Sequence, residues 1–109
     1  MTNKCKKTNH RFTLLYGNYV HGNGIFILAM DKDEIYSDVT VNLYPYRALK
    51  PDSNYIHIPD SIDPVLYEQI KEQLILAEID TVPYGNFDST AKLVRLKPDW
   101  KTHCKPMDE

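Results

Sequence analysis

The chain has 109 residues and a formal net charge of -2 at pH 7, with 42% hydrophobic and 26% charged residues. This size fits one domain that can bury a core without disulfides, and the composition excludes disordered, collagenous and coiled-coil chains. The longest apolar run is too short to span a bilayer, and the lysine-rich start lacks the apolar stretch of a signal peptide. We therefore expect a cytoplasmic protein without membrane contacts.

The first third of the chain predicts strands. Residues 1–11 are basic and lack apolar periodicity, so we expect a flexible tail there. From Phe12 to Tyr16 apolar residues occupy alternate positions, which predicts a strand with Gly17 as a bulge or bend. Residues 21–24 contain Asn-Gly and predict a hairpin turn.

Two more strands are expected next. Residues 25–30 are continuously apolar, which is typical of a central strand covered on both faces, and the polar residues 31–34 predict a reversal. Residues 35–44 alternate and give the strongest strand signal of the sequence. Their alternation assigns three side chains to the core, Val39, Val41 and Leu43, and three to solvent, Asp38, Thr40 and Asn42.

One helix is predicted after a loop and a short extended piece, residues 55–58. Asp63 suits the N-cap, Pro64 suits the first helical position, and Ile62 and Tyr67 occupy the positions of a hydrophobic staple. An apolar stripe at helical spacing extends the prediction to an end near Glu78. The stripe consists of Leu66, Ile70, Leu74 and Ala77.

The remaining sequence predicts a turn over residues 81–86, a last strand over residues 90–96 and a flexible tail over residues 98–109 with Trp100 as an anchor. The expected fold is α+β: a mainly antiparallel four- to five-stranded sheet with one helix packed on a face. We assign this single domain to residues 12–97.

The candidate metal sites have unfavourable spacing. Asp31, Asp33 and Glu34 lack the further ligands and the glycine of a calcium loop. Cysteine and histidine occur near both ends, at Cys5, His10, His103 and Cys104. Adjacent side chains rarely reach one zinc ion, so we expect no metal or cofactor and two free thiols, with a disulfide between Cys5 and Cys104 as the alternative. The lysine beside each cysteine favours the thiolate.

Catalytic motifs are also missing. No G-x-S-x-G elbow occurs, and the glycine-rich residues 17–24 lack the Lys-Ser/Thr pair of a phosphate loop. His57 with Asp60 is the one acid/base pair that the sequence offers, and we expect His57 to be a surface or edge histidine. A small hydrolase using this pair is the least favoured hypothesis, and we predict that the protein is not an enzyme.

The charges are unevenly distributed along the chain. Residues 51–90 contain eight acids and one base, Lys71, whereas residues 91–107 are basic. An acidic surface repels nucleic acid and attracts basic grooves, and tyrosines are common interface anchors. The candidate partner-binding residues are Tyr44, Tyr46, Tyr55, Asp60, Asp63, Glu68, Glu72, Glu78 and Asp80. The alternative is an ordinary solvated helix face.

Several stretches resemble a known family. They are residues 38–43, with Thr40 to Leu43 as the clearest signature, residues 55–58, the helix, and residues 84–87 and 93–96. These resemble an uncharacterised family of short bacterial proteins carried on prophage-like and conjugative elements. The resemblance implies a mobile-element context, in which small proteins often inhibit host defence, anti-CRISPR proteins among them, by stoichiometric binding.

We therefore predict a non-catalytic protein-binding module, an anti-CRISPR-type inhibitor that binds a nucleic-acid-handling enzyme through an acidic and tyrosine-rich surface. We expect no direct nucleic-acid binding. The alternative is a small-molecule or nucleotide-binding protein that uses a sheet–helix cleft lined by tyrosines.

Overall fold

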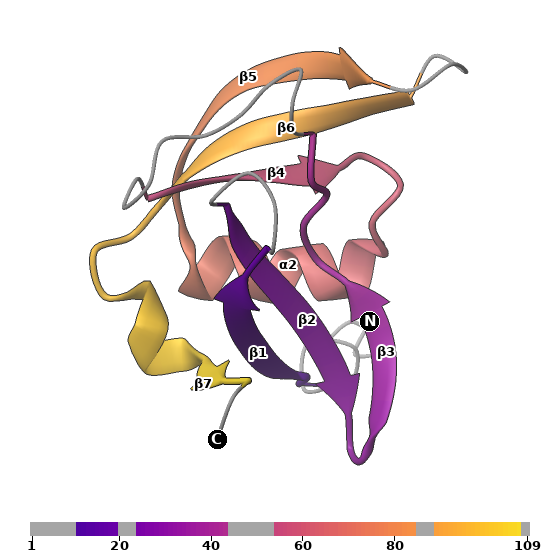
Figure 1. The fold of residues 1–109 in the computed structure, drawn as a ribbon, viewed down its shortest axis with the longest axis vertical. Helices are drawn as coiled ribbons and strands as arrows, with labels where there is room; N and C mark the ends of the chain where they lie inside the picture. Colours follow the sequence, from indigo (N-terminus) through magenta and orange to yellow (C-terminus); the bar gives the residue numbers. More distant parts are fainter. Residues whose placement is uncertain (1–10, 20–23, 44–53, 85–88, 108–109) are drawn as a thin grey trace, which may run out of the picture.

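The described residues fold as two β-sheets that pack against the same α-helix. The computed structural model describes residues 11–19, 24–43, 54–84 and 89–107. One sheet has the order β3-β2-β1-β7 and the other the order β4-β6-β5 (Figure 1). The elements in chain order are β1 (Thr13–Asn18), β2 (Ile25–Asp31), β3 (Glu34–Asp38), β4 (Tyr55–Pro59), α2 (Pro64–Gln73), β5 (Ile75–Tyr84), β6 (Ser89–Leu96), the 3-10 helix η1 (Trp100–His103) and β7 (Lys105–Pro106).

The predicted α+β class and the mainly antiparallel pairing are confirmed, and the prediction of a single sheet is wrong. The strands divide between two sheets, and β7 runs parallel to β1. Period-two alternation identifies strands but does not say which strands pair, so it could not reveal this division.

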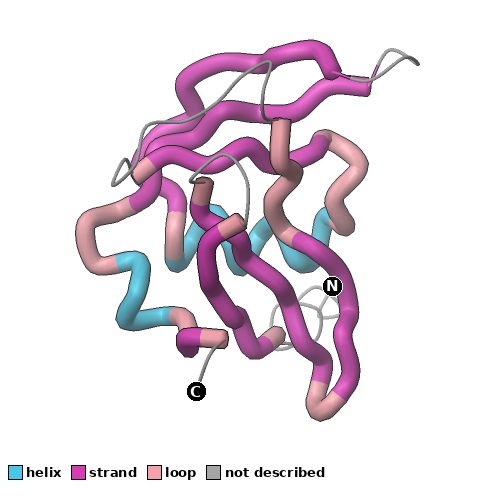
Figure 2. Tube along the Cα trace, in the orientation of Figure 1, coloured by secondary structure: helices cyan, strands magenta, loops and turns pink. Residues whose placement is uncertain are grey.

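The main core lies where α2 meets both sheets (Figure 2). Three helix residues at the predicted spacing, Leu66, Ile70 and Leu74, are fully buried. They share one apolar cluster with residues of both sheets, among them Leu14, Ile27, Ile56, Ile58, Val94 and Leu96. The helix therefore fixes the position of one sheet relative to the other.

The antiparallel β1–β2–β3 meander has the strand order that the sequence predicts. Gly17 pairs with Phe26 in an unbroken register, so of the predicted bulge or bend at Gly17 the bulge is wrong. The register shift of this sheet lies instead at Ala29 and Met30. The β2–β3 turn forms as predicted, and Lys32 adopts a positive φ of 60° there. Most of the turn predicted between β1 and β2 lies outside the described residues.

The segment after β3 crosses from the first sheet to the second. The Val39 N–H donates to the Ile27 carbonyl in β2, and the Val41 N–H donates to the His57 carbonyl in β4, at 2.9 and 3.0 Å. Residues 39–43 are therefore not part of one long strand. The prediction that Thr40 faces solvent is wrong, because its Oγ1 accepts a hydrogen bond from the buried Ile27 N–H.

The helix begins as predicted and ends earlier. Asp63 caps α2, accepting a hydrogen bond from the Leu66 N–H at 3.3 Å, and Pro64 occupies its first turn. The helix ends at Gln73, and β5 occupies the residues expected to form the last helical turn and the following turn. Ala77 is consequently exposed on a strand rather than buried on a helix.

The chain beyond Pro98 packs against the first sheet, where we expected a tail. Trp100 is 3% exposed, and its ring meets the Tyr16 ring edge-on with 5.1 Å between centroids. The short β7 then lies beside β1, with Lys105 opposite Leu15. No helix within the described part of the chain is long and apolar enough to cross a membrane.

Candidate functional site

The predicted partner-binding residues do not all belong to one free surface. Tyr44 and Tyr46 lie outside the described residues, and Tyr55 is half-buried at the start of β4. The six predicted acids are all described, and they differ in how far intramolecular contacts occupy them.

Asp60 and Asp63 stabilise the two ends of the β4–α2 connection. Asp60 accepts hydrogen bonds from the Thr90 hydroxyl and the Lys92 ammonium group, and these donors lower the pKa of its carboxyl group. Asp63, besides capping the helix, accepts a hydrogen bond from the Tyr36 hydroxyl at 2.9 Å. That bond raises the pKa of Tyr36. Both carboxylates therefore have structural partners.

Glu78 is tied to the helix through Tyr67. The Tyr67 hydroxyl donates to Glu78 Oε2 at 2.5 Å, joining α2 to β5. Burial of the phenol, followed by this hydrogen bond to a carboxylate, raises the pKa of Tyr67. The ammonium groups of Lys71 and Lys92 lie 5.8 and 5.9 Å from the Tyr67 ring centroid. Two lysines and one glutamate thus lie close to this tyrosine.

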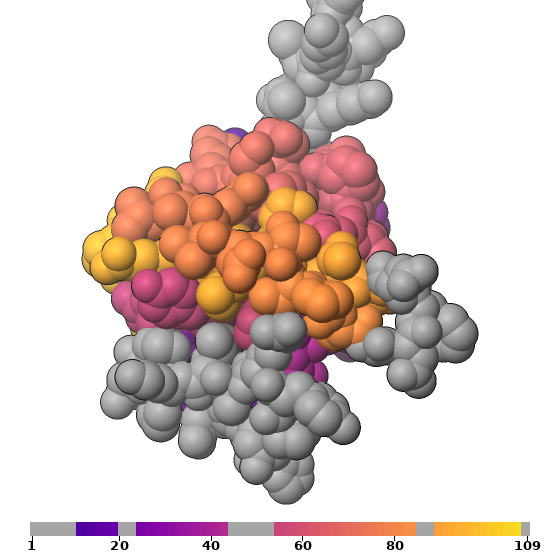
Figure 3. All heavy atoms as spheres, turned by 90° about the horizontal axis from the view of Figure 1, so that it is seen from above, coloured from indigo at the N-terminus to yellow at the C-terminus, as the bar shows by residue number. Residues whose placement is uncertain are grey.

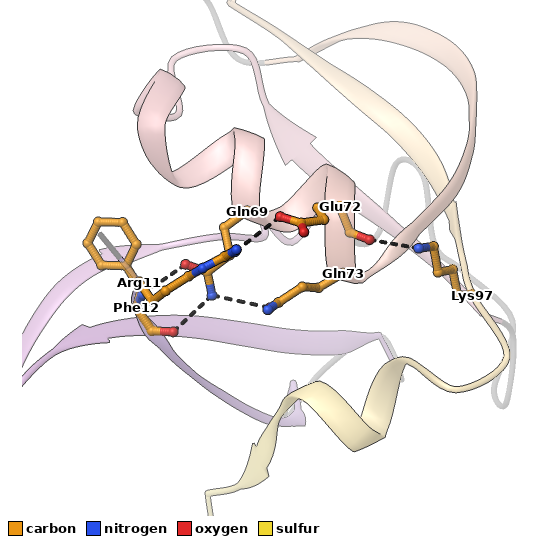
Figure 4. Close-up of polar contacts among 6 residues, drawn as sticks. All are labelled: Arg11, Phe12, Gln69, Glu72, Gln73 and Lys97. Atoms are coloured by element: carbon orange, nitrogen blue, oxygen red, sulfur yellow. Dashed lines mark hydrogen bonds and ion pairs between the residues drawn. The ribbon is translucent and has the colours of Figure 1, made fainter. Parts of the chain in front are cut away.

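The other three acids are more accessible. Glu68 is exposed on α2, and Asp80 is exposed on β5, where it accepts a hydrogen bond from the neighbouring Thr81 N–H. Glu72 pairs with Arg11 at 3.1 Å, and both side chains are at least half exposed (Figure 4). Exposed pairs of this kind are weak and screened by salt.

The strand β5 adds an apolar feature that the sequence analysis missed. Leu76 and Ile79 are 52% and 50% exposed, although both are large aliphatic residues. Each is the extra residue at a register shift between β5 and β6. Glu78 lies between them in the sequence and Asp80 follows Ile79, and we call these four residues the β5 edge patch.

The position of this patch leaves it accessible. β5 is the last strand of its sheet and pairs only with β6 among the described strands. Figure 3, which views the molecule from above the orientation of Figure 1, shows β5, in orange, at the surface. The helical spacing of Leu74 and Ala77 concealed the patch, because it assigned the start of this segment to a helix.

The structure does not join His57 and Asp60 into an acid/base pair. His57 is 5% exposed, so it is not a surface histidine, but it does lie on an outer strand of its sheet, as the edge alternative expected. It alternates with Ile56 and Ile58, which face the helix, and so lies on the opposite face of β4. Asp60 instead contacts Thr90 and Lys92.

The described part of the chain contains no group of three or more histidine, cysteine, aspartate or glutamate side chains that could hold a metal ion. Cys5 and His10 lie outside it. Cys104 is half-buried, and desolvation raises the pKa of its thiol to about 11, opposite to the effect expected from Lys105. Its thiol is therefore protonated at neutral pH.

Comparisons of the chain with protein-family models, with curated protein sequences and with solved structures gave no match.

Proposed function

We propose that the protein is a non-catalytic interaction module that binds a basic protein partner through the β5 edge patch. The observation that carries this proposal is the half exposure of Leu76 and Ile79 beside two acidic residues. Interfaces combine an apolar centre with a polar rim, and the patch has this arrangement on a small scale. The two aliphatic side chains would supply buried contact area, and Glu78 and Asp80 would attract a positively charged surface.

Side chains rather than backbone groups would make these contacts. Register shifts at Leu76 and Ile79 interrupt the regular spacing of hydrogen-bonding groups along β5. Bulges of this kind, and the proline at position 83, which has no N–H, disfavour the addition of a further strand to the edge. The partner would therefore present a pocket or groove to the patch.

The class of partner that suits this patch is a protein with a basic groove. Grooves that bind nucleic acid are basic, and an acidic surface can compete for them. An inhibitor of a nucleic-acid-handling defence enzyme, the role suggested by the family resemblance, is the specific form of this proposal.

The test compares retention of bacterial proteins by the tagged chain and by matched variants. We expect the wild type to retain a basic protein in stoichiometric amount, with retention falling as the salt concentration rises. The double change Leu76→Ser and Ile79→Ser should abolish retention, and Asp80→Lys should weaken it. Ile35→Ser is the control, because Ile35 is an exposed aliphatic residue of the other sheet.

Equal retention by all variants would contradict the proposal, as would a wild-type chain that retains nothing. A retained basic protein that does not handle nucleic acid would support the interaction module and exclude the inhibitor role.

A further inference from the structure

A cleft outside the acidic β5 edge patch is lined by basic side chains, and we call it the basic cleft. It has a volume of about 470 Å³ and lies between the start of β1, the second half of α2 and the η1–β7 segment. This volume falls within the range of small-molecule sites, roughly 300–1,000 Å³. Its lining residues are Arg11, Phe12, Thr13, Leu14, Gln69, Gln73, Thr102, His103, Cys104 and Lys105.

Among the described residues no carboxylate lines the cleft, although acids outnumber bases in the whole chain. Lys105 provides one positive charge, Arg11 provides a second that its ion pair with Glu72 partly offsets, and His103 adds a ring that donates hydrogen bonds. Cys104 is uncharged at neutral pH because burial raises the pKa of its thiol. The lining therefore favours an anionic ligand.

The wall formed by α2 is hydrogen-bonded to Phe12 and contains an amide donor. Gln69 accepts a hydrogen bond from the Phe12 N–H at 2.8 Å and donates to the Phe12 carbonyl at 2.9 Å (Figure 4). Its amide nitrogen also donates to Gln73 Oε1 at 3.2 Å. Gln73 accepts this bond through its side-chain oxygen. The Gln73 amide nitrogen therefore remains as a donor for a ligand.

Two negative groups near the cleft are already compensated. Glu72 lies on the same helix but binds the Arg11 guanidinium at 3.1 Å. Arg11 has further N–H donors beyond the one used in this pair. The carbonyl groups at the helix end carry partial negative charge, and the Lys97 ammonium group donates to one of them, the Glu72 carbonyl, at 2.7 Å (Figure 4).

We infer that this cleft binds a small sugar phosphate, independently of the proposed protein partner. Arginine and lysine together suit a phosphate dianion, and the hydroxyl and amide groups of the lining suit the hydroxyl groups of a sugar. The Phe12 ring is buried and lies 4.5 Å from the Tyr36 ring, centroid to centroid. It therefore offers no open face on which a nucleobase could stack, which disfavours a nucleotide.

The inference is tested by two-dimensional NMR titration of the isotope-labelled full chain with glucose phosphate, inorganic phosphate and glucose. Glucose phosphate should shift the amide signals of Thr13 and of residues 102–105 in a saturable way. Inorganic phosphate should bind more weakly, and glucose should cause no shift. Lys105→Gln should weaken binding of glucose phosphate about tenfold, because it removes one charge-assisted contact.

Lys32→Gln is the matched control, since it removes one exposed lysine that does not line the cleft and should leave the affinity unchanged. The signals of residues far from position 105 report whether the Lys105→Gln chain is folded. The inference is overturned if glucose phosphate causes no saturable shift, if Lys105→Gln binds as tightly as the wild type, or if glucose alone binds equally well. Binding of inorganic phosphate as tight as that of glucose phosphate would overturn the assignment of a sugar ester.

Discussion

Gln69 pairs with the backbone of Phe12 as a neighbouring strand would. Its Oε1 accepts from the Phe12 N–H at 2.8 Å, and its Nε2 donates to the Phe12 carbonyl at 2.9 Å. Both residues are buried, so water cannot replace these bonds. One helix side chain thereby fixes the start of β1 against α2, at the wall of the basic cleft.

Replacing Gln69 should therefore destabilise the protein strongly. Gln69→Leu introduces an apolar side chain of similar size and removes both hydrogen bonds to the Phe12 backbone. We expect the free energy of unfolding to fall by about 2–4 kcal/mol, from the loss of two buried hydrogen bonds. Urea denaturation measures this change. Gln73→Leu is the control and should cost less than about 1 kcal/mol, since Gln73 makes one part-buried bond; equal costs would contradict the pairing.

The hydrogen bond from Tyr67 to Glu78 should be visible in the titration of tyrosine. The pKa of Tyr67 is raised, so its phenol is protonated at pH values where an exposed tyrosine is ionised. The contribution of this hydrogen bond to the free energy of unfolding is fully present below the ordinary pKa of 10. It is lost as the pH rises through the higher pKa of the folded state. In an ultraviolet pH titration, Tyr67→Phe should remove absorbance at the most alkaline end. A wild type and variant that differ near pH 10 instead would contradict this arrangement.

The hydrogen bonds to Asp60 predict a loss of stability in acid. Its pKa is lowered in the folded protein, so the folded state binds fewer protons than the unfolded state around the ordinary value of 3.8. The contribution of Asp60 is present above that value and is lost as the pH falls through the lower, folded-state pKa. Asp60→Asn should flatten this part of the stability profile measured by thermal denaturation, whereas Glu68→Gln, a change at an exposed acid, should not.

The β5 edge patch should tolerate changes that abolish partner binding. Leu76 and Ile79 are half exposed, so replacing each by serine should change the free energy of unfolding by about 1 kcal/mol or less. Urea denaturation checks this for the same variants used in the binding test. A loss of several kcal/mol would show that the two side chains support the sheet rather than serve an interface.

Local signals explain which parts of the fold were predictable. The start of α2 is encoded by adjacent residues, Asp63 and Pro64, and the β2–β3 turn by a short polar run, so both were predicted. The end of α2 was not, because Leu74 and Ala77 continue the helical spacing. Pairing with β6 converts this segment into β5, and no sequence-local property reports that pairing.

The candidate sites depend on contacts between distant segments even more strongly. The acids at positions 60 and 78 were identified from charge, but their partners Lys92 and Tyr67 are set by the packing of β6 and α2. The basic cleft joins residues 11–14 to residues 102–105, which the sequence assigned to or near two unstructured tails. Its positive lining could not be seen from the acidic balance along residues 51–90.

Cys104 should react slowly with alkylating reagents at neutral pH. Burial raises the pKa of its thiol to about 11, and the thiolate is the reactive form. In a Cys5→Ser chain, where Cys104 is the remaining thiol, alkylation by iodoacetamide should accelerate as the pH approaches 11 and should match a free cysteine peptide only after denaturation. Mass spectrometry follows the reaction. Alkylation at pH 7 as fast as that of the peptide would show that Lys105 stabilises the thiolate more than burial destabilises it. The uncharged state assigned to Cys104 in the lining of the cleft would then be wrong.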